Sequence, residues 1–191
     1  MGRIIAIDPG PRESAMVEME NNHVICHRYE TNQRIVDALG SHTGKTRNLA
    51  LEMVASYGMP VGKSVFETCV WIGRFIESWG GDYDLIYRKT VCAHICGSAR
   101  AKDSNIRQAL IDRFGGIDGE AKAIGGKKCG KCKGKGWFGA GRPVCPECGG
   151  KGYETPPGPL NGISGDEWAA LAVAVTWLDG KDVKIVERKG A

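Results

Sequence analysis

The sequence lacks any apolar run of the roughly 20 residues that a membrane-spanning helix needs. Its N-terminal stretch, MGRIIAIDPG, also lacks the layout of a signal peptide and leads directly into an apolar segment. Eight cysteines in 191 residues are too few for the disulfide framework of a small secreted domain. We therefore expect a cytoplasmic protein that makes no contact with a membrane.

A complete phosphate-binding loop is also missing. The tripeptide Gly44-Lys45-Thr46 resembles the end of such a loop, but the glycine and the strand that should precede it are absent. We therefore expect no nucleotide cofactor.

Histidines are few, and their positions give no spacing for a shared metal ion, so we assign structural or surface roles to His23, His27, His42 and His94.

Hydrophobic residues make up 42% of the chain, and its length suits one domain with a small insertion. Apolar runs and turn signals predict three successive strands, with Asn21-Asn22 as the turn between the second and the third. Helices and strands then alternate, which predicts an α/β fold with a mixed sheet flanked by helices. The expected strands are 3–8, 14–20, 23–29, 48–54 and 83–87, and the expected helices are 31–39, 62–79, 98–114 and 165–178.

Positive charge is concentrated in one glycine-rich segment. Residues 125–152 hold seven lysines and arginines against one acid, a net charge of +6, so the rest of the chain carries −2 of the formal total of +4. A basic segment on a mildly acidic body suits contact with a polyanion, and nucleic acid is the usual one. A solvated loop without a partner is the alternative.

Four of the eight cysteines lie in this segment, within two Cys-x-x-Cys-x-Gly-x-Gly repeats. Their overall spacing, C-x₂-C-x₁₂-C-x₂-C, lets four thiolates surround Zn²⁺ tetrahedrally and leaves no ligand position open for catalysis. The repeats are similar to the zinc module of DnaJ-type chaperones, although only two of that module's repeats are present. We predict a structural zinc knuckle with the ligands Cys129, Cys132, Cys145 and Cys148.

Lysines of this knuckle surround Trp137 and Phe138. Basic residues beside aromatic ones suit contact with a DNA backbone together with stacking on an exposed base. The knuckle would then grip DNA arms or prop a junction open; the alternative is a metal-stapled loop that merely folds. For the first interpretation the candidate DNA-binding residues are Lys131, Lys133, Lys135, Trp137 and Arg142.

Three acids stand where burial of a charge is costly unless a cation compensates it. Asp8 ends an apolar strand, Glu52 lies among apolar neighbours, and Asp166 opens an apolar helix. Asp8 could instead belong to an Asp-Pro-Gly turn, and Asp166 could complement the helix dipole. If adjacent strands bring Asp8 and Glu52 together and the helix adds Asp166, this cluster of hard oxygen ligands suits Mg²⁺ or Mn²⁺.

These residues carry a resemblance to a known family. The segment IIAIDPG at 4–10, Glu52 before a long helix, and Asp166 ahead of ALAVAV resemble a RuvC-type Holliday junction resolvase of the ribonuclease H-like superfamily. The stretch KTVCAHICGSARAK at 89–102, followed by DSNIRQAL, is similar to the family's Gly-Ser-Ala-like turn, lysine and helix. Phage-encoded resolvases of this kind are similar in size, and such an origin would mean the host cytoplasm.

The resemblance implies a ribonuclease H-like fold and a metal-dependent nuclease that cuts DNA at branch points, usually as a homodimer. It implies that Asp8, Glu52 and Asp166 are the catalytic metal ligands for Mg²⁺ or Mn²⁺. It also implies that Lys89 and Lys102 are basic residues near the active site that bind DNA.

One position departs from the family pattern. A second aspartate commonly follows three residues after the position of Asp166, and here that residue is Ala169. Glu167 is adjacent to Asp166 but would point elsewhere on a helix. Water or another carboxylate would then complete the metal shell.

We therefore expect a crossover junction endodeoxyribonuclease. A less selective phage nuclease for branched DNA is one alternative, and a non-catalytic zinc-binding DNA or protein adaptor on a decayed nuclease fold is another. The expected organisation is a nuclease core at 1–114 and 160–180, a zinc-knuckle insertion at 122–155 and a charged tail at 181–191.

Overall fold

The computed structural model describes residues 2–41, 47–56, 58, 60–116, 119–135, 143–153 and 157–180. These residues form two compact units. Unit 1 comprises the described residues of Met1–Arg107 and Ile163–Ala191, and unit 2 comprises those of Gln108–Gly162. The candidate DNA-binding residues Trp137 and Arg142 lie outside the described part of the chain, as does the expected tail at 181–191.

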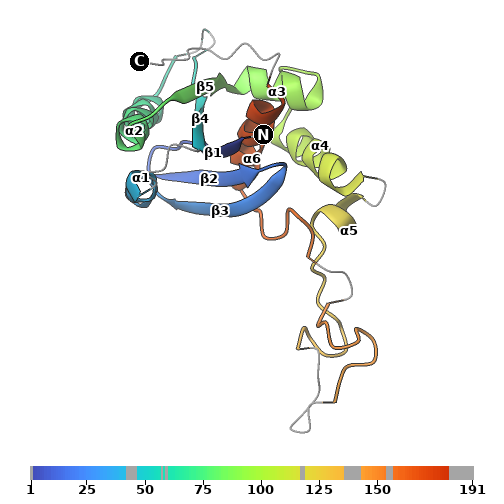
Figure 1. Cartoon of the computed structure of the whole chain (residues 1–191). Helices are drawn as coiled ribbons and strands as arrows, with labels where there is room; N and C mark the ends of the chain where they lie inside the picture. The colour runs from blue at the N-terminus through green and yellow to red at the C-terminus, as the bar shows by residue number, and fades with distance from the viewer. Residues whose placement is uncertain are drawn as a thin grey trace. The chain divides into compact units, whose positions relative to one another are not determined.

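Unit 1 is built on five strands, which are β1 Arg3–Asp8, β2 Glu13–Glu20, β3 His23–Thr31, β4 Arg47–Met53 and β5 Tyr83–Tyr87. They form one mixed sheet in the order β3-β2-β1-β4-β5 (Figure 1). The first three strands are an antiparallel meander, and its tight turn holds Asn21 and Asn22 at φ angles of 49° and 68°. Because β1 pairs in parallel with β4, and β4 with β5, the sheet is mixed as predicted.

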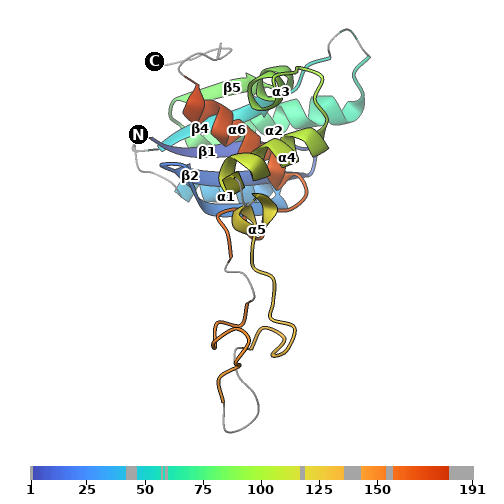
Figure 2. The same cartoon turned by 90° about the vertical axis from the view of Figure 1, so that its right-hand side faces the viewer.

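Helices cover both faces of this sheet. α1 Asn32–Ser41 and α2 Lys63–Trp79 pack on one face, whereas α6 Glu167–Asp179 crosses the other over β1, β2 and β4 (Figures 1 and 2). α6 is almost entirely apolar and buried, as a helix pressed against a sheet must be. The core between the sheet, α1 and α2 consists of Ile5, Ile7, Met16, Ile35, Leu39, Leu49, Leu51, Ile72 and Phe75.

The alternation of side chains along the central strands fixes where the candidate acids point. Ile7 of β1 and Leu51 of β4 belong to the core on the side of α1 and α2. Successive residues of a strand point to opposite faces. Asp8 and Glu52, each the next residue along its strand, therefore face the side of the sheet that α6 covers.

The connection after β5 differs from the sequence-based expectation. α3 Arg88–Cys96 begins at the residue after β5, and Gly97 ends it in the left-handed conformation at φ 69°. The helix expected at 98–114 starts at Asp103 as α4 Asp103–Gly115, because a turn occupies the residues between the two helices. The boundary between the two units falls within α4. Within the described residues, no helix combines the length and apolarity of a bilayer span.

Unit 2 continues from α4 into the short α5 Gly119–Ala123. Beyond α5 its two arms run antiparallel, joined by isolated bridges between Gly125 and Pro157 and between Lys128 and Tyr153. The end of the unit holds the four cysteines of the knuckle, all of them buried. The expected insertion bounds of 122–155 and core bounds of 1–114 and 160–180 stay predictions.

Candidate active site

Asp8 and Glu52 lie side by side at the carboxyl ends of two parallel strands. Ile7 on β1 pairs with Leu51 on β4, and Asp8 and Glu52 follow these two residues. The side chains of residues at matching positions on neighbouring strands point to the same face. Glu52 is 9% exposed and Asp8 is half-buried, so the two carboxylates occupy a largely desolvated position.

Asp166 comes from the opposite end of the chain. It is the N-cap residue of α6, it is exposed, and its side chain makes no capping hydrogen bond. Its negative charge is near enough to Asp8 to contribute to the raised pKa of that carboxyl. The structure therefore brings Asp8 and Glu52 to the same end of the sheet and places Asp166 near Asp8.

The electrostatics of this cluster are unfavourable without a cation. Burial raises the pKa of Asp8 to about 8, and the charges of Glu52, Asp166 and Asp103 add to this effect, whereas Arg88 opposes it. Burial also raises the pKa of Glu52, and Arg88 again lowers it. Desolvation and like charge both disfavour the ionised carboxylates. Positive charge at this place would therefore stabilise them.

Arg88, the first residue of α3, supplies positive charge to these acids. Its Nη1 lies 3.2 Å from Oε2 of Glu52, and its Nη2 pairs with the exposed carboxylate of Asp103 at the start of α4. The sequence analysis missed both residues. Tyr87 ends β5 and pairs with Met53, the residue after Glu52. The residue that follows Tyr87 therefore lies at the same edge of the sheet as Glu52, and this position could have identified Arg88.

The two lysines expected near the active site are exposed. Lys89 follows Arg88 in the first turn of α3. Lys102 lies in the turn before α4, where its backbone N–H donates to Oδ1 of Asn105 at 3.1 Å and its carbonyl accepts from the N–H of Asn105 at 2.9 Å. Contact of Lys89 and Lys102 with DNA stays a prediction.

The chemistry of the acids fits a divalent cation, because hard carboxylate oxygens are the donors that Mg²⁺ and Mn²⁺ prefer. The acids are not gathered as tightly as ligands around an ion. Among the described residues, the four cysteines of unit 2 form the group of potential ligands that is compact enough for one ion. A cation bound by Glu52 would compete with Arg88, which is already 3.2 Å from its carboxylate.

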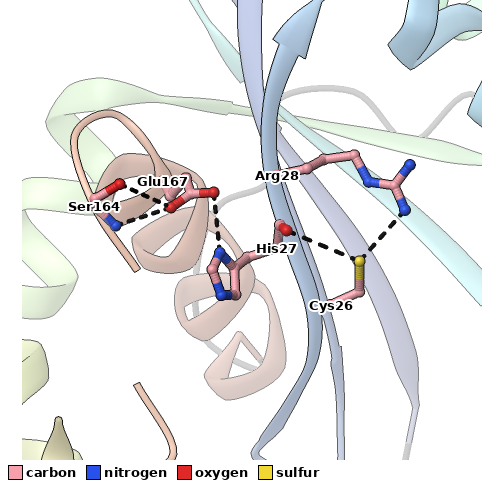
Figure 3. Close-up of polar contacts among 5 residues, drawn as sticks. All are labelled: Cys26, His27, Arg28, Ser164 and Glu167. Atoms are coloured by element: carbon pink, nitrogen blue, oxygen red, sulfur yellow. Dashed lines mark hydrogen bonds and ion pairs between the residues drawn. The ribbon is translucent and has the colours of Figure 1, made fainter. Parts of the chain in front are cut away.

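Glu167, the first residue of α6, fastens this helix to β3 (Figure 3). Its Oε2 accepts the backbone N–H of Ser164 at 2.9 Å, and its Oε1 lies 3.0 Å from Nδ1 of His27. Glu167 is only 5% exposed. Because Asp166 is its neighbour in the chain, these contacts also fix the backbone that carries Asp166.

Replacing Glu167 with alanine is expected to lower the free energy of unfolding by about 1–3 kcal/mol, because the Ser164 N–H and the His27 ring would lose a buried partner. Urea unfolding followed by circular dichroism measures this change. The matched control is Glu77→Ala at an exposed position of α2, for which a change of less than about 0.5 kcal/mol is expected. Equal losses in the two variants would contradict the anchoring role.

The four cysteines of unit 2 have the spacing of a tetrahedral metal site. The Sγ atoms of Cys129 and Cys145 are 3.8 Å apart, those of Cys132 and Cys148 are 3.7 Å apart, and all four lie within 4.8 Å of one another. Zn–S bonds of about 2.3 Å in a tetrahedron give S···S separations of about 3.8 Å. The distances are far too long for disulfides. The residues therefore fit Zn²⁺, as the sequence predicts.

Two matching turns build this knuckle. The N–H of Lys135 donates to the carbonyl of Cys132, and the N–H of Lys151 donates to that of Cys148, each at 3.0 Å. The Gly152 N–H lies 3.2 Å from the Cys148 sulfur, and a side chain at Gly152 would meet the Gly134 carbonyl oxygen. Burial raises the pKa of the Cys148 thiol to about 11, so a cation is needed to hold it as a thiolate.

The basic residues of the knuckle that the structure describes are exposed. Lys131 pairs with Glu147 across the knuckle, with Nζ 3.3 Å from Oε1. Lys133 has a positive φ of 50°, and Lys135 is likewise open to solvent. DNA contact by these lysines is untested and stays a prediction.

The mixed sheet with helices on both faces gives the chain a RuvC-like fold. The chain is similar to the structure of Thermus thermophilus RuvC, with a TM-score of 0.57 and 12% identity over 96% of this chain and 99% of that one. It is also similar to T. thermophilus RuvC in complex with Holliday junction substrate, with a TM-score of 0.54 and 12% identity over 97% of this chain and 100% of that one.

Sequence comparison adds no relative. The sequence matches no protein-family model. None of the curated proteins matches it either. At 12% identity the structural likeness establishes the fold, and the function has to be argued from the site.

Proposed function

We propose that this protein is a divalent-metal-dependent endodeoxyribonuclease that resolves Holliday junctions by hydrolysing phosphodiester bonds. The observation that carries the proposal is that Asp8 and Glu52 each follow the paired residues Ile7 and Leu51 at the carboxyl ends of β1 and β4, with Asp166 at the start of the helix over the same face. This arrangement occurs in a fold similar to that of a protein solved with a Holliday junction substrate. The choice of a junction over other DNA rests on that likeness.

Asp8, Glu52 and Asp166 would hold Mg²⁺ or Mn²⁺, which when bound activates water and stabilises charge on the phosphate. The charges of Glu52 and Asp166 both act on Asp8, whereas that of Asp166 is not among the causes that shift the pKa of Glu52, so the carboxylate of Asp8 is the one suited to a shared ligand role. Arg88 is a further cation at this edge, and its guanidinium group has the geometry to bind a DNA phosphate. No serine or cysteine nucleophile is required.

Exposed basic residues of unit 1 would hold the DNA backbone near the acids. Lys89 and Lys102 are candidates because both are open to solvent, at the starts of α3 and α4. In unit 2, Lys131, Lys133 and Lys135 would contact DNA arms, together with Trp137 and Arg142 of the same segment. A zinc ion bound by the four cysteines would brace this basic segment without taking part in cleavage.

A homodimer is the proposed form of the enzyme, because a four-way junction presents two equivalent strands to be cut. The exposed face of α2 supports this proposal. Phe66 is 61% exposed and Val70 60% exposed, and their spacing of four residues places them on one side of the helix. Large apolar side chains exposed together commonly mark a protein–protein contact.

The test is cleavage of a synthetic four-way junction in Mg²⁺, compared with linear duplex, fork and single-stranded DNA of the same sequence. We expect paired cuts in the junction and little cutting of linear duplex, with loss of activity in EDTA. Comparable cutting of forks and flaps would favour the less selective nuclease. Binding of junctions without cutting in Mg²⁺ or Mn²⁺ would favour the non-catalytic adaptor, which the alanine at position 169 allows.

A further inference from the structure

An exposed aromatic residue shares a row across the sheet with Asp8. Asp8 of β1 pairs with Ala15 of β2, and Ala15 pairs with Tyr29 of β3. Directly paired residues point to the same face of a sheet, so Tyr29 and Asp8 both face the side covered by α6. Two strand spacings of about 4.8 Å separate their backbones by roughly 10 Å.

The residue between Asp8 and Tyr29 in this row is small. Ala15 contributes only a methyl group, and it is fully buried. Tyr29 is 47% exposed, on the edge strand of the sheet. Burial raises the pKa of Tyr29, and the negative charges of Glu13, Asp166 and Asp8 together with a side-chain hydrogen bond with Glu13 raise it further.

The position of Tyr29 is fixed relative to the start of α6. His27 lies two residues earlier on β3 and therefore on the same face, and its Nδ1 is 3.0 Å from Oε1 of Glu167 (Figure 3). Glu167 adjoins Asp166. The contact therefore ties the strand that carries Tyr29 to the helix end that carries a candidate metal ligand.

We propose that Tyr29 is a base-stacking residue that holds an unstacked nucleobase next to the scissile phosphate. The inference rests on the proposed nuclease function and adds a specificity residue to it. An aromatic ring open to solvent on one side offers a face to any base, whatever its sequence. Bases within a regular duplex are already stacked on their neighbours, so the ring gains a partner only where bases separate. Tyr29 would therefore favour branched DNA over linear duplex.

The experiment measures binding of a four-way junction in Ca²⁺ without turnover, with 2-aminopurine placed on either side of the mapped cleavage site. Tyr29→Leu keeps an apolar side chain without a ring, and Tyr29→Phe keeps the ring. Ile25→Ala on the same strand, where the side chain is 49% exposed, is the matched control. Thermal melts of each variant establish that it folds.

For Tyr29→Leu we expect junction affinity to fall about tenfold and the 2-aminopurine quenching on binding to disappear, while Tyr29→Phe and Ile25→Ala stay within about twofold of wild type. Affinity for linear duplex should be the same in all four proteins. Wild-type affinity and quenching in a folded Tyr29→Leu variant would overturn the inference and leave the nuclease proposal intact. A wild-type protein that neither binds nor cuts junctions would overturn both.

Discussion

Cleavage of a four-way junction is expected to fall on the order of 10³-fold or more when Asp8 is replaced by asparagine, while junction binding persists. Asparagine has nearly the same shape, but it removes the negative charge that a shared metal ligand needs. Gel-based cleavage in Mg²⁺ measures the first effect, and binding in Ca²⁺ measures the second. Asp82→Asn, at an exposed position before β5, is the control and should cut normally.

A second measurement on the same variant reports metal binding without catalysis. A metal ion at a concentration of 100 times its dissociation constant stabilises the folded wild-type protein by about 2.7 kcal/mol and therefore raises its melting temperature. Asp8→Asn should lose most of this shift. In EDTA the variant should melt no lower than wild type, because burial and the neighbouring acids already oppose a charge on Asp8, whose pKa they raise to about 8. Normal cleavage by a folded Asp8→Asn protein would refute the assignment of this residue.

Replacing Cys145 with serine is expected to remove bound zinc and unfold the cysteine-containing end of unit 2. The Cys145 sulfur is 3.8 Å from that of Cys129, and structural zinc binding of this kind contributes free energy on the order of 10 kcal/mol. Metal content by atomic emission should fall from about one zinc per chain to near zero. Limited proteolysis should then cut within 119–162, whereas the thermal transition of unit 1 should persist. Cys69→Ser, at an exposed position on α2, should retain zinc.

The same variant tests what the knuckle does for DNA. Residues 125–152 carry a net charge of +6. The affinity for duplex DNA falls as the salt concentration rises, and each phosphate contact that is lost reduces the steepness of log affinity against log salt concentration by about 0.9. A smaller slope in Cys145→Ser would support DNA contact by the basic residues of the segment. An unchanged slope would leave the knuckle with a folding role alone. Full zinc occupancy in Cys145→Ser would contradict the ligand assignment itself.

The sequence predicts the sheet well because its strands carry strong local signals. β5 at Tyr83–Tyr87 matches the expected bounds, and the Asn21-Asn22 turn fixes the meander. The start of α2 falls within one residue of expectation because glycines bound it at both ends. The sequence does not predict α3, because this helix begins at Arg88 directly after β5, with no glycine, proline or polar linker between the two elements. The helix expected from residue 98 starts five residues later, because residues 98–101 form a turn that is closed by the Ala101 N–H and the Ser98 carbonyl.

The candidate site was partly predictable for a related reason. Acids in apolar surroundings are visible in a sequence, and the structure brings Asp8 and Glu52 into adjacent positions and Asp166 near them. The roles of Arg88 and Asp103 could not be predicted from the sequence. Arg88 contacts both Glu52 and Asp103, and these contacts depend on where α3 starts. For His27 the sequence predicts a structural or surface role, but not its partner Glu167, which is 140 residues away in the chain. The catalytic roles of these residues stay predictions.

The matched turns of the knuckle bear on how this protein can change during evolution. After each Cys-x-x-Cys pair a turn closes through a backbone hydrogen bond to the carbonyl of its second cysteine, and the two turns meet where Gly152 approaches Gly134. The nine residues from 136 to 144, between the first turn and Cys145, include no cysteine, histidine, aspartate or glutamate. Their length and sequence can therefore drift from one relative to the next without loss of the metal, which would let selection retune this segment for new partners while the turns remain constant.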